Sequence, residues 1–159
     1  MTDVRVFRDY PHPPGKVWRV LTDPQLIELW SMRPEGFAAV VGTRFKFYGK
    51  PNKGWRGFVE CEVLEVRERE LLRYSWVGNE GAAATQVRYT LEPRGNGTRL
   101  TMEHTGFAGL GGFLLANVFM RPGWNKTLRE TFPTVLDAVD ENGNLPPESR
   151  LKPLFEPEK

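Results

Sequence analysis

The chain has 159 residues, the usual size of one domain, and its 22 basic and 20 acidic residues leave a net charge of +2. This near balance excludes the strongly basic surface of a nucleic-acid-binding protein, and 40% hydrophobic with 26% charged residues excludes a disordered chain. The single cysteine, Cys61, excludes an intramolecular disulfide and a zinc site built from several cysteines.

The N-terminal segment predicts one strand and two short helices. Over residues 4–10 the side chains alternate between two sets, Val4, Val6 and Arg8 in one and Arg5, Phe7 and Asp9 in the other. This pattern, which ends at Pro11, is typical of a strand. Apolar side chains recur at helical spacing over residues 13–21. The sequence Thr22-Asp23-Pro24-Gln25 combines a capping side chain with a proline in the first turn, which predicts a second helix that ends near Trp30.

Five further segments with strand character come next. They span residues 40–48, 55–66, 71–77, 85–91 and 98–105. The alternation changes phase at Leu64-Glu65-Val66, which predicts a β-bulge. Residues 93–97, Pro-Arg-Gly-Asn-Gly, form the clearest hairpin turn in the chain.

The last predicted element is a helix from Trp124 to about Asp140, whose apolar side chains recur at helical spacing. Pro133 lies inside this pattern and predicts a kink or a division of the helix. We expect the uncharged, glycine-rich segment 106–120 to form a lid or a second oligomer surface. Residues 141–159 hold four prolines, so we expect an extended or mobile tail after a domain of residues 1–140.

This order of elements predicts an α+β fold. Two short helices after strand 1 and five more strands without intervening helices favour an antiparallel sheet over a parallel one. We therefore expect a curved antiparallel six-stranded sheet wrapped around a long C-terminal helix, because this arrangement buries both apolar faces.

Several phrases of the sequence resemble the START-like superfamily, also called SRPBCC or birch-pollen-allergen-like. They include Pro13-Pro14-Gly15-Lys16-Val17-Trp18, Leu72-Arg73-Tyr74-Ser75-Trp76, His104-Thr105-Gly106-Phe107 and Gly123-Trp124. Within the superfamily the chain is most similar to the family named for the activator of the 90-kDa heat-shock-protein ATPase. The resemblance implies a helix-grip fold with a cavity between sheet and helix that accepts an apolar or aromatic small molecule.

Aromatic residues make up 12% of the chain, and many would face this space. A solid core is the alternative for any single ring. The polar ends of Tyr74, Tyr89 and His104 favour a pocket of mixed character. The expected ligand-binding residues are Trp30, Phe45, Phe47, Trp55, Tyr74, Trp76, Tyr89, Met102, His104, Trp124 and Leu128.

No motif for phosphate binding, nucleophilic catalysis or metal coordination is present in the sequence, so we expect no catalytic residue, cofactor or metal. The first hypothesis is the binding or carriage of an apolar or aromatic small molecule. A cyclase or aromatase-like enzyme that uses His104, Tyr74 and Tyr89 is the second, because such reactions depend mainly on positioning. The third, which the resemblance suggests, is a module that regulates a chaperone.

These hypotheses carry expectations about partners and location. The expected partner is an apolar or aromatic small molecule, and a second copy of the chain and a chaperone stay open; we expect no nucleic acid. The N-terminus carries no secretory signal, and the longest apolar run is too short to span a bilayer, which favours a cytoplasmic protein without an integral membrane segment.

Overall fold

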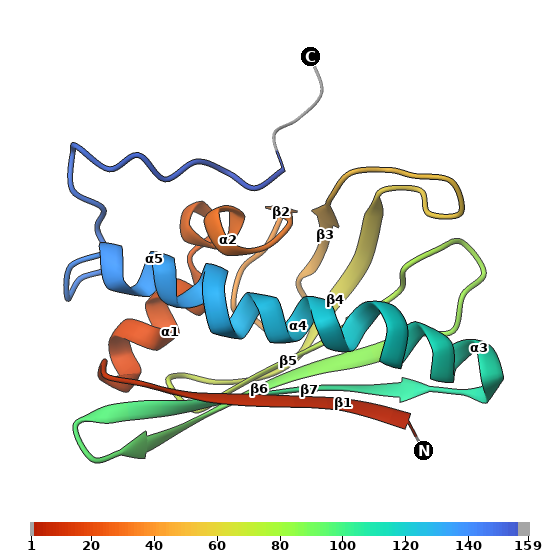
Figure 1. Ribbon diagram of the computed structural model, residues 1–159, viewed down its shortest axis with the longest axis horizontal. Helices are drawn as coiled ribbons and strands as arrows, with labels where there is room; N and C mark the ends of the chain where they lie inside the picture. Colours follow the sequence, from red (N-terminus) through yellow and green to blue (C-terminus); the bar gives the residue numbers. More distant parts are fainter. Residues whose placement is uncertain (1, 156–159) are drawn as a thin grey trace.

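Seven antiparallel strands form one sheet in the computed structural model, which describes residues 2–155 (Figure 1). Their bounds are Thr2–Tyr10 for β1, Arg33–Glu35 for β2, Arg44–Tyr48 for β3, Phe58–Arg67 for β4, Leu71–Trp76 for β5, Thr85–Arg94 for β6 and Gly97–Phe107 for β7. The order across the sheet is β1-β7-β6-β5-β4-β3-β2. A long helix crosses one face, so the predicted α+β helix-grip fold is confirmed.

The predicted count of six strands is wrong by one. The additional strand, β2, has three residues and pairs with β3 through Arg33 and Tyr48 at one end and Glu35 and Lys46 at the other. It is too short for its alternation to show in the sequence, and its central residue, Pro34, is a strand breaker that sheets tolerate at an edge.

The five longer predicted strands are present with shifted ends. Strand β3 begins at Arg44 instead of Val40, because the chain turns through Gly42 at a φ of +91°. The predicted bulge is confirmed, since the pairing of β4 with β5 shifts register between Val63 and Glu65.

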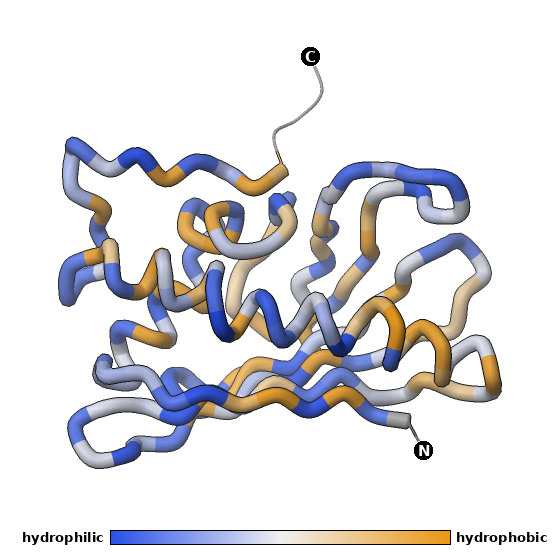
Figure 2. Tube along the Cα trace, in the orientation of Figure 1, coloured by the Kyte–Doolittle hydropathy of each residue, from blue (hydrophilic) through white to orange (hydrophobic). Residues whose placement is uncertain are grey.

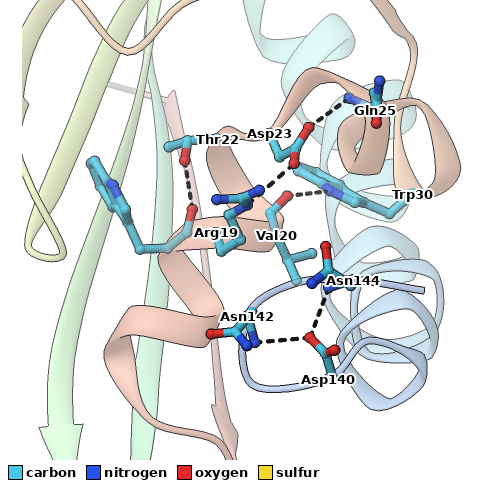
Figure 3. Close-up of polar contacts among 10 residues, drawn as sticks. Arg19, Val20, Thr22, Asp23, Gln25, Trp30, Asp140, Asn142 and Asn144 are labelled. Carbon is cyan, nitrogen blue, oxygen red and sulfur yellow. Dashed lines mark hydrogen bonds and ion pairs between the residues drawn. The ribbon is translucent and has the colours of Figure 1, made fainter. Parts of the chain in front are cut away.

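Two short helices, α1 (Pro14–Thr22) and α2 (Pro24–Trp30), follow β1 as predicted. Asp23 ends the first helix and caps the second, since its carboxylate accepts from the Gln25 backbone N–H at 3.0 Å (Figure 3). The Thr22 hydroxyl turns back and donates to the Trp18 carbonyl at 2.8 Å. The capping group is therefore the aspartate.

The long helix starts earlier than predicted. Its consecutive helical segments are α3 (Gly109–Leu114), η1 (Leu115–Met120), α4 (Arg121–Lys126), η2 (Thr127–Thr131) and α5 (Phe132–Ala138). The predicted start was Trp124, with residues 106–120 as a separate segment, because the glycines in that segment weaken its helix propensity. In the structure residues 109–120 are helical, and most of their large apolar side chains face outward. Ala116 is the one residue of α3 and η1 that is fully buried.

Pro133 does not divide the helix (Figure 1). It lies at the start of α5, directly after the π-helical turn η2. A π-turn changes the hydrogen-bonding register, and a proline at the first turn of the following α-helical stretch needs no intrahelical partner for its missing N–H.

After the helix the chain turns at residues 140–144. The Asp140 carboxylate accepts from the backbone N–H groups of Asn142 and Asn144 at 2.8 and 2.9 Å (Figure 3). The tail then runs back over α2, where Leu154 N–H donates to the Glu28 carbonyl at 3.0 Å. Leu145 and Leu151 pack against the core, so the described part of the tail is extended and attached.

Candidate functional site

Ten of the eleven predicted ligand-binding residues are buried in the core between the sheet and the helices. Each of the ten has at most 8% of its surface exposed; they are Trp30, Phe45, Phe47, Tyr74, Trp76, Tyr89, Met102, His104, Trp124 and Leu128. Trp55 is the exception. It lies in the loop before β4, is half-buried, and donates its indole N–H to the Gly78 carbonyl at 2.9 Å.

The rings on the sheet form one continuous aromatic cluster with the helix. From β3 to β5, the Phe45 and Tyr74 ring centroids are 5.3 Å apart, and from β5 to β6 those of Tyr74 and Tyr89 are 6.2 Å apart. Trp124 on α4 lies 6.1 Å from both Tyr89 and Trp76. Most of these contacts are tilted or edge-to-face, which is favourable for aromatic pairs.

These contacts bring the rings of the predicted binding space against one another, since rings at centroid distances of 5–6 Å touch. The cavity itself stays a prediction. A ligand that lies among these rings would have to displace side chains or part of the helix.

Trp30 belongs to a separate group at the other end of the helix. Its ring meets the Phe132 ring edge-on at 5.0 Å, and the Tyr10 ring lies 5.4 Å from the same phenylalanine. The Trp30 indole N–H donates to the Val20 carbonyl at 3.0 Å (Figure 3), so its polar end is already paired. Through these contacts Trp30 packs α2 against α1 and α5.

A buried chain of hydrogen bonds links the long helix to three strands. The Trp124 indole N–H donates to His104 Nδ1 at 3.1 Å, which makes Nδ1 an acceptor and places the ring proton on Nε2. His104 Nε2–H then donates to the Thr85 hydroxyl at 2.7 Å, and that hydroxyl donates to the Trp76 carbonyl at 3.2 Å. Because an indole N–H can only donate, it fixes which group donates and which accepts in all three of these hydrogen bonds.

This network argues against an acid–base role for His104. The residue has no exposed surface, and burial lowers its pKa to about 3, so the ring is neutral near pH 7. Both ring nitrogens are already engaged. His104 therefore holds Trp124 in place. Thr85, which is not among the predicted site residues, belongs to the same network.

Tyr89 is the polar residue of the cluster that lacks a partner. Its side chain is 2% exposed, and among the described residues its hydroxyl is the one fully buried side-chain polar atom without a partner in hydrogen-bonding geometry. Its polar neighbour, the Tyr74 hydroxyl, is close enough to affect the pKa of Tyr89 without forming a well-aligned hydrogen bond. Burial also raises the pKa of Tyr89 and of Tyr74, so both phenols stay protonated and can donate. An unpaired buried hydroxyl is unusual, since buried tyrosines normally find an acceptor.

Two surface grooves, each of about 510 Å³, lie near the β2–β3 edge of the sheet, and the first reaches the cluster at Phe45. The first contains Phe45 and Cys61 among charged side chains of β3 and β4. Burial raises the pKa of the Cys61 thiol, which opposes a reactive thiolate. Arg33, Arg56 and the tail residue Leu154 line the second groove.

Among residues 2–155, none of the helices has both the length and the hydrophobicity that a membrane-spanning segment needs. Across the same residues, no three His, Cys, Asp or Glu side chains lie close enough together to hold a metal ion.

Comparison with known proteins places the chain in a family. Protein MLL2253 from Mesorhizobium loti is 35% identical over 87% of this chain and 99% of its own, with a TM-score of 0.74. CalU16 from Micromonospora echinospora is 25% identical, with 84% and 74% of the two chains covered and a TM-score of 0.65. The Aha1 dimer from Colwellia psychrerythraea has the same fold at 21% identity, with 89% and 98% covered and a TM-score of 0.66.

No protein of curated function matches the chain significantly. The family described as Activator of Hsp90 ATPase homolog 1-like protein matches residues 11–137, from the end of β1 to near the end of α5. This match covers most of the chain and includes the aromatic cluster and the hydrogen bonds that tie it to the helix. The chain therefore belongs to the Activator of Hsp90 ATPase homolog 1-like family.

Proposed function

We propose that the protein binds a small ring-containing apolar molecule between the sheet and the long helix, where the Tyr89 hydroxyl donates a hydrogen bond to it. The observation that carries this proposal is the unpaired hydroxyl of Tyr89 in a surrounding of aromatic rings. Leaving a buried hydroxyl unpaired costs about 1–3 kcal/mol, which a ligand with an acceptor atom would recover.

The start of the long helix is the part that would move to admit the ligand. Segments α3 and η1 bury one residue fully, Ala116, so lifting them exposes little apolar surface. Gly112 packs closely on the backbone of Phe107, and the Phe107 ring lies 4.6 Å from that of His104. Movement there would open a path to His104 and Trp124 at small cost, as for locally weak segments in general.

The side chains around Tyr89 favour a flat ring system as ligand. Tyr74, Trp76 and Trp124 present ring faces and edges, which attract other aromatic rings and reject charged groups. The pKa of each buried tyrosine is raised, so both remain neutral donors suited to a carbonyl or ether oxygen.

The two other hypotheses have less support. A cyclase-like reaction would have to depend on Tyr74 and Tyr89, because both nitrogens of His104 are engaged. For a chaperone partner, the family description is the only support.

Calorimetric titration with two probes of equal shape tests the proposal. 1-Indanone carries a carbonyl acceptor and indane has none. We expect Tyr89→Phe to weaken 1-indanone binding by about 2- to 12-fold, the worth of one hydrogen bond, and to leave indane binding unchanged. Tyr48→Phe is the matched control, because Tyr48 is on β3 beside Arg33 and outside the cluster. Absence of saturable 1-indanone binding, or equal binding to wild type and Tyr89→Phe, would overturn the proposal.

A further inference from the structure

The first half of the long helix presents large apolar side chains to solvent. We call this set the outer helix face; its members are 41–77% exposed and are Leu110, Phe113, Leu114, Leu115, Val118 and Phe119. Figure 2 shows the corresponding hydrophobic colour at the α3 end of the helix. An amphipathic helix on a sheet normally turns such residues inward.

The size of this surface sets it apart from ordinary surface apolar residues. At a side-chain area of roughly 150–250 Å², the exposed fractions correspond to on the order of 600 Å². The largest apolar patch of a typical monomer is about 300–600 Å² and is often functional. No charged residue interrupts the sequence between Glu103 and Arg121, so the outer helix face carries no charge. Its one polar neighbour, Asn117, is hydrogen-bonded to the Phe113 carbonyl and to Arg121.

We propose that the outer helix face is the contact between two copies of this chain. Complete covering of two such faces would bury on the order of 1,200 Å² from these side chains alone, the lower end of a stable protein–protein interface. The same face on both copies gives a self-complementary contact, as a two-fold dimer requires. Antiparallel pairing would also place the helix dipoles in opposite directions, which is favourable.

The charges near the outer helix face favour a second copy over a lipid surface. Peripheral membrane helices combine an apolar face with free basic side chains that attract anionic lipids. Arg121, the first basic residue after the face, already donates to the Asp3 carbonyl at 2.9 Å and to Asn117 Oδ1 at 3.3 Å. The net charge of the chain is only +2. Pairing of two copies needs no free cation at the contact.

Sedimentation velocity from 5 to 200 μM tests this interface. The wild type is expected to approach twice the monomer mass of 18.2 kDa as its concentration rises. The test variant combines Leu110→Glu with Phe119→Glu at the two most exposed positions of the face, 77% and 68%. We expect its dimer dissociation constant to be at least about 30-fold higher, because the interface would bury unpaired charges.

A matched control carries the same charges elsewhere. Val40 and Val41, 62% and 61% exposed in the loop between β2 and β3, are replaced as Val40→Glu with Val41→Glu, and this variant should dimerise like the wild type. Circular dichroism checks that each variant is folded, and Leu110→Ser with Phe119→Ser replaces a misfolded test variant. A wild type that stays at 18.2 kDa at 200 μM, or a folded test variant that dimerises like the wild type, would overturn the proposal. A monomer that floats with phosphatidylglycerol vesicles would overturn it in favour of a lipid surface.

Discussion

The buried state of His104 predicts that the protein loses stability between pH 6.5 and pH 4.5. In the unfolded chain the ring has an ordinary pKa near 6.5, whereas burial lowers the pKa to about 3 in the folded protein. Below pH 6.5 the unfolded chain therefore binds a proton that the folded chain does not. This contribution to stability is complete above pH 6.5 and is lost as the pH falls toward 3.

The size of the loss follows from the shift in pKa. Each pH unit between the two values changes the free energy of unfolding by about 1.4 kcal/mol, so pH 4.5 costs roughly 2–3 kcal/mol relative to pH 7. Urea unfolding followed by tryptophan fluorescence at pH 7.0, 5.5 and 4.5 measures it. His104→Gln is the comparison, because glutamine can accept from Trp124 and donate to Thr85 but does not titrate.

The difference between wild type and His104→Gln isolates this residue. The pKa of Asp9 is lowered by its hydrogen bond with Arg99, and that of Asp140 by backbone donors of the following turn. Both carboxylates are present in the two proteins and so contribute equally to their pH profiles. We expect His104→Gln to be less stable than the wild type at pH 7. Its free energy of unfolding should then fall less than that of the wild type between pH 7 and pH 4.5. Parallel pH profiles of the two proteins would refute the reasoning.

Two pairs of substitutions test other parts of the account. Tyr89→Phe should leave the free energy of unfolding unchanged or raise it by up to about 1 kcal/mol, because it removes an unpaired hydroxyl. Tyr10→Phe should lower it by about 1 kcal/mol, because the Tyr10 hydroxyl donates to the Leu128 carbonyl at 2.6 Å. Urea unfolding measures both, and a clear destabilisation by Tyr89→Phe would mean that this hydroxyl is paired. Gly97→Ala should lower the stability measured by thermal unfolding by about 3 kcal/mol, because a Cβ there would overlap the Tyr10 carbonyl oxygen. Gly123→Ala should instead stabilise α4 by about 0.5–1 kcal/mol, because its Cβ would meet open space. Equal effects at the two glycines would contradict this packing.

Local patterns in the sequence predicted most of the fold. Alternation over residues 85–91 and 98–105, with a glycine-rich turn between them, is sufficient for a hairpin and its facing side chains. The bulge near Leu64 also shows locally, as a change of phase. The three-residue strand around Pro34 and the helical turns that begin at Gly109 are absent from the prediction, because packing against the rest of the chain overrides weak local propensity there.

The candidate site was predicted as a set of residues and not as an arrangement. Ten buried side chains follow from strand alternation and helix spacing, which are local. Whether Tyr74, Tyr89 and Trp124 leave space or touch depends on side-chain volumes across three elements, which no local pattern contains. Alternation places Thr85 on the inward face with Val87, which pairs with His104, but no local pattern shows that the Thr85 hydroxyl bonds to the His104 ring.

Binding of a ring compound beside Tyr89 is the central claim, and indole NMR tests it most directly. With ¹⁵N-labelled tryptophan, each of the five indole N–H groups gives a signal that reports on its surroundings. On titration with 1-indanone we predict large, saturable shifts for Trp76 and Trp124 and small ones for Trp18, which lies on α1. Unchanged Trp76 and Trp124 signals, or shifts confined to Trp55 in its loop, would contradict a site between the sheet and the helix.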